Sequence, residues 1–452
     1  MLFLKLLSAI ASLFAIYPLL KFVRKDEINI FDLIILFHTI FYCFVPIISN
    51  YSAFLWLKDF YFEDNIIFRI FIYYILIIFL ILRIDLFWST HYKYRKNIIN
   101  ITYYIKSYPQ IEVSWAFIGI LVINLLISWL WYLPQASYME TFYEFSKTQG
   151  YTFKSPMYLL YEAIFTLCFS FSLLLYLKEN LSHKKKYILL FTLLGFALLL
   201  LFLPRRIMLF YLILSLVIVY SVKRNFFTKK KIIWIVIILF VILKIYFPFY
   251  NVMRRTNINI ESNNFTTSLI HIIEDTNSRF DSNKAHAAES SEGRALNLYY
   301  ALYRIIKYDK SPSNGRLLIA AIDHATPKYI NPNKGAGSSI LLEKKMQIRT
   351  DQADSLLLLA YGDFGLIVGA FYASFLFVLI ISMYVLLDRF SLIFFNLRST
   401  IGILLIVYLI SFAWNVEAAL DGSFASLVHL TIISIILMLL HKFNIIGYKK
   451  VS

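Results

Sequence analysis

The sequence has few of the residues on which compact soluble proteins depend. Only 2 of its 452 residues are cysteine, and both Cys43 and Cys168 lie in apolar stretches, which excludes a disulfide framework and a cysteine-based metal site. Charged residues make up 16% of the chain, whereas hydrophobic residues make up 60%. A soluble domain of this length could not bury so much apolar surface, so the composition indicates a helical membrane protein with several spans.

Several functional motifs are also absent. No loop contains a nucleotide-binding motif, and no compact set of His, Asp or Glu has the spacing of metal ligands. We therefore expect no cofactor and no metal. The net charge of +17 would suit nucleic acid, but most Lys and Arg fall in short runs between apolar stretches. Such runs mark topology and contact anionic lipid head groups, so the expected partners are membrane lipids and not nucleic acid.

What the chain has instead is apolar stretches that can cross a bilayer as helices, which needs about 20 residues each. Eleven are found: Leu2–Leu20, Ile28–Ser49, Ile66–Phe87, Val113–Leu133, Met157–Leu177, Tyr187–Leu203, Ile207–Val222, Ile232–Phe249, Ser355–Leu387, Ile401–Asn415 and Phe424–Leu440. The predicted fold is an all-α polytopic membrane protein with about 11 transmembrane helices. The first stretch lacks a signal peptide's basic start and cleavage site, so we expect it to be retained. The ninth is long, so we expect it to be tilted or to extend beyond the bilayer.

Basic residues occupy every second connection between these stretches. The basic connections hold Lys21/Arg24/Lys25, Lys93/Arg95/Lys96/Lys106, Lys178/Lys184/Lys185/Lys186, Lys223/Arg224/Lys229/Lys230/Lys231, Arg389/Arg398 and Lys442/Lys449/Lys450. Because cytoplasmic loops of membrane proteins are rich in Lys and Arg, all of these connections are predicted to be cytoplasmic. The N-terminus is then outside and the C-terminus is in the cytoplasm.

One long polar interruption, residues 251–354, separates an N-terminal set of spans (1–250) from a C-terminal set (355–452). Its many charges cannot sit in hydrocarbon, so we predict a large loop on the outer side. Within it, Ser290–Tyr308 carries Leu296, Tyr299, Tyr300, Tyr303 and Ile306 at helical spacing. This predicts an amphipathic helix that either lies against the membrane surface or packs on the bundle. A short helix is expected at Thr267–Glu274 and a flexible turn at Asn331–Ser339.

Several arginines lie at the predicted outer boundary or on the long loop. Arg205 and Arg206 stand in a tight outer turn and oppose the positive-inside bias. Arg254 follows the eighth span, and Arg294 and Arg304 lie about 15 Å apart along the loop helix. A guanidinium matches phosphate oxygens, so these arginines are candidate ligands of a phosphate or pyrophosphate. The alternatives are snorkelling of Arg205 and Arg206 to lipid phosphate, and simple solvent exposure of the others.

Two carboxylates, Asp351 and Asp354, precede the ninth span. Each could cap the start of that helix or act as a general base beside arginines. His324 is a further candidate base. An outer site with fixed positive charge and a base suits a reaction in which a hydroxyl displaces a lipid-linked phosphate or pyrophosphate.

Local patterns in this outer region carry a resemblance. They are Arg205-Arg206 followed by an apolar span, Gly293-Arg294 followed by Tyr299 and Tyr300, Arg304 separated from Gly315 by ten residues, and the run from Asp354 through Tyr361-Gly362-Asp363-Phe364-Gly365 to Gly369. Together with one large outer loop in the second half, they resemble the Wzy-type O-antigen and capsule polymerases, which are related to the O-antigen ligases. Ligase-like members often have His-Asn where this chain has Asp354-Ser355, so a histidine base is not implied there.

The resemblance implies a GT-C-like scaffold in a bacterial inner membrane with the large loop in the periplasm. It implies a polymerase that transfers a growing glycan from undecaprenyl pyrophosphate onto the next lipid-linked repeat unit, without a metal and with inversion. The catalytic candidates are then Asp354, Asp351 and Arg294, and the pyrophosphate ligands are Arg205, Arg206, Arg254 and Arg304. A chain-length regulator is a partner that the resemblance allows. An O-antigen ligase or another lipid-linked glycosyltransferase, and a flippase or transporter, remain as alternatives.

Overall fold

The computed structural model describes part of the chain. The described residues are 2–44, 47, 62–91, 98–106, 115–132, 156–178, 181–201, 205–228, 230–231, 234, 237, 291–309, 311–326, 331, 335–346, 355–395, 398–416, 423–424, 426–428, 430–431 and 435. All regular structure among them is helical, and they contain no strand. The predicted all-α class therefore holds for the described residues. Arg254, Asp351 and Asp354, and the helix expected at Thr267–Glu274, lie outside them.

The helices of the N-terminal half largely follow the predicted spans. They are α1 (Leu2–Ser12), η1 (Leu13–Ala15), α2 (Ile16–Arg24), α3 (Ile30–Thr39), the π-helix η2 (Ile40–Phe44), α5 (Asp64–His91), α6 (Ile101–Lys106), α7 (Trp115–Ile127), the π-helix η5 (Ser128–Tyr132), α9 (Pro156–Lys178), α10 (His183–Leu200), α11 (Arg205–Val222) and η6 (Arg224–Phe226). The short helix α6 lies in a connection for which no helix was predicted.

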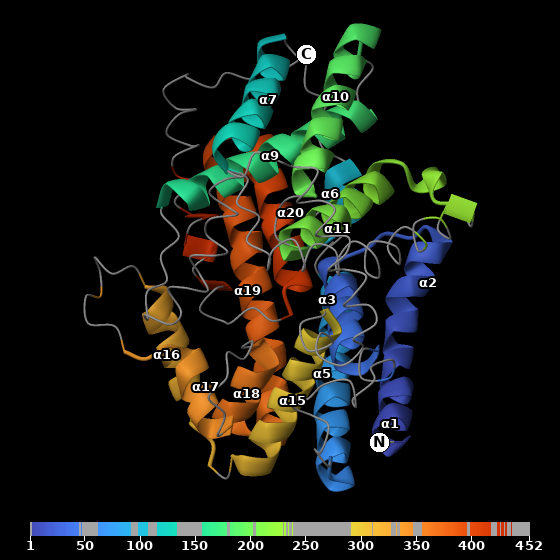
Figure 1. Cartoon of the computed structure of the whole chain (residues 1–452). Helices are drawn as coiled ribbons and strands as arrows, with labels where there is room; N and C mark the ends of the chain where they lie inside the picture. Colours follow the sequence, from blue (N-terminus) through green and yellow to red (C-terminus); the bar gives the residue numbers. More distant parts are fainter. Residues whose placement is uncertain are drawn as a thin grey trace, which may run out of the picture.

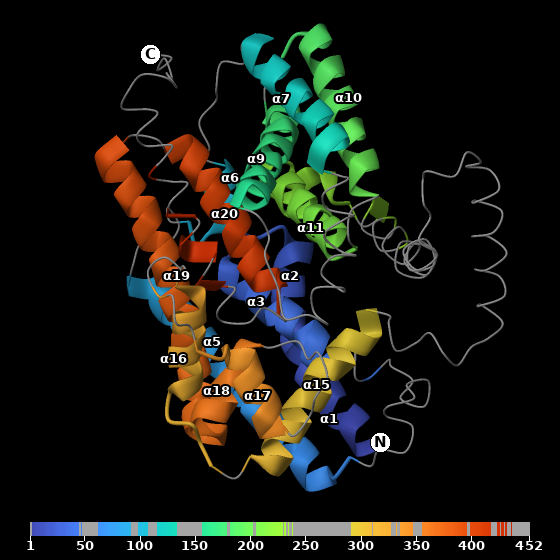
Figure 2. The same cartoon turned by 60° about the vertical axis from the view of Figure 1, so that its left-hand side comes forward.

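The second half contains α15 (Ser291–Tyr308), α16 (Arg316–Ala325), α17 (Ser338–Met346), α18 (Leu356–Phe364), α19 (Leu366–Phe395) and α20 (Arg398–Trp414). Helix α15 confirms the predicted loop helix almost to the residue. Helices α16 and α17 were not predicted, and α17 begins inside the segment expected to be a flexible turn. Figures 1 and 2 show α15 to α18 gathered at one end of the molecule, with α7 and α10 at the other.

Three described helices are long and apolar enough to cross a membrane. They are Phe3–Arg24, which joins α1, η1 and α2, Asp64–Trp88 in α5, and Leu366–Arg389 in α19. Shorter apolar helices occur at Ile30–Phe44, Trp115–Trp131, Ala163–Leu177, Ile207–Val222 and Gly402–Trp414. These helices agree with a helical membrane protein. The number of eleven spans and the GT-C-like scaffold remain predictions, and the expected spans at 232–249 and 424–440 lie largely outside the described residues.

The predicted ninth span is not one tilted helix, because the chain turns sharply at Gly365. Gly365 has a φ of 73°, which a glycine adopts without steric cost and other residues rarely do. Beyond the turn, a Cβ at Gly369 would lie 2.7 Å from the carbonyl oxygen of Ala360, so α18 and α19 pack backbone against backbone. The membrane-crossing helix therefore begins at Leu366, and α18 is a separate, buried helix.

Helix α15 packs on the bundle, which decides between the two placements that its sequence allowed. It contacts α5, η2, α17 and α18, and Tyr299, Tyr303 and Ile306 are buried. The Tyr303 hydroxyl accepts the N–H of Glu63 at 3.1 Å, just before α5 begins. Lys307 Nζ lies 2.5 Å from Glu63 Oε1, and this hydrogen bond raises the pKa of Lys307. The large loop is thus fastened to the first turn of α5.

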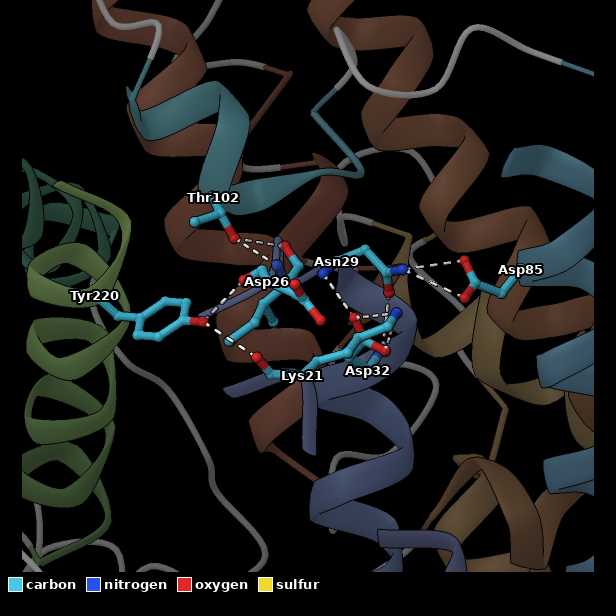
Figure 3. Close-up of polar contacts among 8 residues, drawn as sticks. Lys21, Asp26, Asn29, Asp32, Asp85, Thr102 and Tyr220 are labelled. Carbon is cyan, nitrogen blue, oxygen red and sulfur yellow. Dashed lines mark hydrogen bonds and ion pairs between the residues drawn. The ribbon is translucent and has the colours of Figure 1, made fainter. Parts of the chain in front are cut away.

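A polar cluster, here called the polar clamp, joins α2, α3 and α5 through Lys21, Asn29, Asp32 and Asp85 (Figure 3). Lys21 Nζ donates to Asp32 at 2.8 and 3.1 Å, and Asn29 Nδ2 donates to Asp85 at 3.1 Å. Asn29 and Asp32 also form a capping box at the start of α3. Asn29, Asp32 and Asp85 are buried. These charged groups therefore fix the mutual register of three helices.

Connections that were predicted to be cytoplasmic meet around this clamp. The Tyr220 hydroxyl at the end of α11 donates to the carbonyl of Asp26 at 2.8 Å, and Thr102 exchanges hydrogen bonds with the backbone of Ile28 at 2.7 and 2.9 Å (Figure 3). These contacts bring the connections near residues 21–25, 93–106 and 223–231 to one end of the helices. Their location on a common, cytoplasmic side of the membrane remains a prediction.

Removal of the Asp32 carboxylate should destabilise the protein strongly. Asp32→Ala leaves Lys21 without its carboxylate partner and removes one of the two hydrogen bonds of the capping box of α3, so we expect a loss of about 3 kcal/mol. The measurement is thermal unfolding of the purified protein in detergent. The control is Arg24→Ala, which removes an exposed cation from α2, the helix that carries Lys21. It should leave the transition almost unchanged. Equal transitions for the two variants would show that the clamp does not stabilise the bundle.

Candidate functional site

One end of the molecule is a module of α15, α16, α17 and α18, here called the outer module because the sequence predicts it to lie outside. Lys345 of α17 connects its parts, because its Nζ donates to both carboxylate oxygens of Asp309 at 2.9 and 2.8 Å. The same nitrogen donates to the carbonyls of Ser311 at 2.8 Å and of Gly362 at 3.0 Å. One ammonium group therefore holds α17, the end of α15 and α18 together.

Asp363 of α18 is fully buried and caps α16. Its Oδ1 accepts the N–H of Leu317 at 3.0 Å and its Oδ2 that of Leu318 at 3.1 Å, which satisfies two free amides at the helix start. Burial raises the pKa of the Asp363 carboxyl, although these two amides and the charge of Lys345 oppose the increase. A Cβ at the neighbouring Gly362 would lie 2.8 Å from Cδ1 of Leu317 and 3.0 Å from Cδ1 of Ile305, so a side chain there would displace these two side chains.

Arg304, one of the predicted pyrophosphate ligands, lies at the junction of α15 and α17. Its Nε donates to the carbonyl of Met346, the last residue of α17, at 3.1 Å. Its guanidinium carbon lies 4.1 Å from the ring centroid of Tyr308. A guanidinium at a helix C-terminus stabilises the free carbonyls there, so this arginine has at least a structural role.

Ser355, the residue after Asp354, begins α18 beside the interior of the bundle. Its Oγ accepts the N–H of Leu358 at 3.2 Å as the helix cap, and it lies 2.7 Å from the Tyr42 hydroxyl on the π-helix η2. The Tyr73 hydroxyl donates to the carbonyl of Leu357 at 2.8 Å. Tyr73 is about 14 Å along α5 from its first residue, Asp64, so α18 starts well inside the end of this candidate span.

The two candidate carboxylates therefore lie on a segment with both ends fixed. Residues 347–354 lead from Met346, which binds Arg304, to Ser355, which binds Tyr42. Asp351 and Asp354 belong to this segment and lie outside the described residues. The Cα of Asp354 is nevertheless about 3.8 Å from that of Ser355 by covalent geometry. Ser355, and not Asp351 or Asp354, is the N-cap of α18, so the capping role that was an alternative for these carboxylates is taken by Ser355.

The other candidate arginines are placed only by the helices that carry them. Arg205 and Arg206 begin α11, and Arg294 belongs to the first turn of α15. Figures 1 and 2 both show the first turn of α15 as the end of that helix nearer to α11. Arg294 therefore lies at the end of α15 nearer to α11, whereas Arg304 lies toward the other end of α15. Arg254 lies outside the described residues.

His324, the further candidate base, lies in the last turn of α16. It packs beside Gly337, where a Cβ would lie 3.3 Å from its ring. The preceding Asp323 accepts the N–H of Gly335 at 3.0 Å and a hydrogen bond from Asn331. These contacts close the loop between α16 and α17, so His324 belongs to the support of the module and not to the region of Ser355.

A small, mainly apolar cavity beside the π-helix η2 could not be predicted from the sequence. It has a volume of about 20 Å³, roughly that of one water molecule, and Ser8, Tyr42, Cys43, Tyr74 and Tyr299 contribute to its lining. π-helices recur at functional sites, and η2 carries both Tyr42 and Cys43. The tyrosines in apolar stretches were the only signal in the sequence. The described residues contain no group of three His, Cys, Asp or Glu that could hold a metal.

Comparisons with known proteins give no relative. No protein-family model, no curated protein and no solved structure matches the chain.

The outer module should depend on Lys345. Lys345→Met leaves the carboxylate of Asp309 buried without its ion pair, and we expect a loss of about 3 kcal/mol. The measurement is the rate of limited proteolysis within residues 291–364 of the detergent-purified protein. Lys344→Met is the matched control, since Lys344 is exposed in the same helix. Similar cleavage of both variants would show that Lys345 does not hold the module together.

Proposed function

We propose that this protein is a polysaccharide polymerase that joins lipid-linked oligosaccharide repeat units at the outer face of a bacterial inner membrane. The donor is a growing glycan on undecaprenyl pyrophosphate, and the acceptor is a hydroxyl of the next lipid-linked repeat unit. The resemblance of the Arg205-Arg206, Gly293-Arg294 and Asp354–Gly369 patterns to Wzy-type polymerases supports this proposal. In this topology the N-terminus and the module of α15 to α18 are periplasmic, and the polar clamp is at the cytoplasmic side.

The observation that carries the proposal is that the described residues on both sides of the candidate carboxylates are anchored to other helices. The carbonyl of Met346 accepts a hydrogen bond from Arg304 at 3.1 Å, and Ser355 Oγ lies 2.7 Å from the Tyr42 hydroxyl. Asp351 and Asp354 lie between these two anchors in the sequence. The candidate ligands Arg205, Arg206 and Arg294 lie at the starts of α11 and α15.

In the proposed reaction, Asp354 takes the proton of the acceptor hydroxyl as its oxygen forms a bond to the anomeric carbon of the donor. The bond from that carbon to the pyrophosphate breaks, and its electron pair leaves with the pyrophosphate. Arg205, Arg206 and Arg294 stabilise the charge that develops there, with Arg254 and Arg304 as further ligands. Attack opposite the leaving group inverts the anomeric centre. Asp351 is the second candidate base.

The decisive experiment is deletion of the gene in its host, followed by a gel of the surface glycans. Loss of the ladder, with lipid A core that carries a single repeat unit, supports the polymerase. Core without any repeat unit, while polymer accumulates on the carrier lipid, would identify a ligase. An unchanged ladder would exclude both reactions and favour transport or an unrelated role.

Replacement of Asp354 tests the catalytic assignment. Asp354→Asn keeps the shape of the side chain but removes its basicity, so polymer formation in the complemented deletion strain should fall by about 100-fold or more. Asp309→Asn is the control for a carboxylate with a structural role, and polymerisation should persist as long as the protein is inserted. A normal ladder from Asp354→Asn, with a short ladder from Asp351→Asn, would move the base to Asp351.

A further inference from the structure

A groove between α5 and α19 lies apart from the outer module. It has a volume of about 450 Å³, and its described lining residues are Leu80, Arg83, Ile84, Phe87, Trp88, Phe371, Ser374, Phe375 and Val378. Ser374 is buried and donates its hydroxyl to the carbonyl of Ala370 at 2.9 Å, so it offers no hydrogen to a ligand. The described wall is therefore apolar and aromatic except for one guanidinium.

Arg83 is an exposed cation on α5, a mainly apolar helix that also contains Arg69 and Asp85. It lies within the candidate span Asp64–Trp88, and its guanidinium carbon is 5.1 Å from the ring centroid of Phe79. An arginine at lipid depth is costly unless its charge meets water or an anion.

The position of Arg83 near the end of its span suggests which anion it meets. It precedes Trp88, where the candidate span ends, by about 7.5 Å of helix. A snorkelling arginine side chain can reach the head groups over that distance, where lipid phosphates lie. The adjacent groove accepts an apolar chain, and Arg is well suited to phosphate oxygens.

We propose that this groove binds an anionic phospholipid from the leaflet at the C-terminal end of α5. Its phosphate is paired with Arg83, and one acyl chain lies between Phe87 and Trp88 of α5 and Phe371 and Phe375 of α19. The site is independent of the proposed glycosyl transfer, because it uses none of the residues assigned to that reaction. The lipid would fill the gap between two of the long apolar helices and neutralise the exposed charge.

The test is native mass spectrometry of the full-length protein, released from detergent with dioleoyl phosphatidylglycerol. We expect one retained lipid per chain, and about tenfold or weaker retention after Arg83→Leu, because a charge-assisted hydrogen bond is lost. Arg83→Leu makes the span more apolar, so insertion is not impaired. Arg83→Lys should recover part of the binding. Arg69→Leu, an equally exposed arginine of α5 outside the groove, should retain the lipid.

Two results would overturn the proposal. Unchanged lipid retention by Arg83→Leu would show that Arg83 does not bind the phosphate, and an equal loss with Arg69→Leu would show that retention depends only on the overall charge of the protein. If phosphatidylcholine were retained as well as phosphatidylglycerol, the site would not select anionic lipids. If the protein retained inorganic phosphate but no lipid, the acyl chain would have no role in binding. A dimer that Leu80→Trp disrupts, with no bound lipid, would instead make the groove an interface between two copies.

Discussion

The turn between α18 and α19 is the constraint on which the outer half of the structure depends. Gly365 adopts a left-handed φ of 73°, and Gly369 allows the backbone of α19 to approach Ala360. Because α18 turns back there, Asp363 reaches the first amides of α16 and the carbonyl of Gly362 reaches Lys345. A larger residue at Gly369 would force α18 and α19 apart, and one at Gly362 would displace the side chains of Leu317 and Ile305. The packing of α18 against its neighbours thus depends on a few close contacts.

Much of the helical framework could be predicted from hydropathy and spacing. The periodic tyrosines of α15 gave its bounds, and the basic connections near residues 21–25, 93–106 and 223–231 do meet at one end. The break at Gly365 was missed because the apolar run continues through it, so the charge of Asp363 between two glycines was the only local signal. Asp32 and Asp85 were also missed, because their partners are distant in sequence; Asn29 and Asp85 are 56 residues apart.

The candidate site residues remain predictions, whereas the contacts of their surroundings could not be predicted from the sequence. Arginines and carboxylates could be chosen by residue type and by their position near predicted boundaries. The contacts of Tyr42 with Ser355 and of Lys345 with Asp309 join residues that are distant in the sequence, so no local pattern reveals them. Arg304 illustrates the difference, since its hydrogen bond to Met346 gives it a structural role that is independent of any ligand.

The hydrogen bond between Tyr42 and Ser355 has a consequence for biogenesis, since it joins residues 313 positions apart. At a synthesis rate of about 5 to 20 residues per second, Tyr42 emerges roughly 15 to 60 s before its partner exists. Tyr73 waits almost as long for the carbonyl of Leu357. During this interval the hydroxyls of Tyr42 and Tyr73 are without the partners that they have in the folded protein. The packing of the N-terminal helices around these tyrosines can therefore be completed only when the last quarter of the chain has been made.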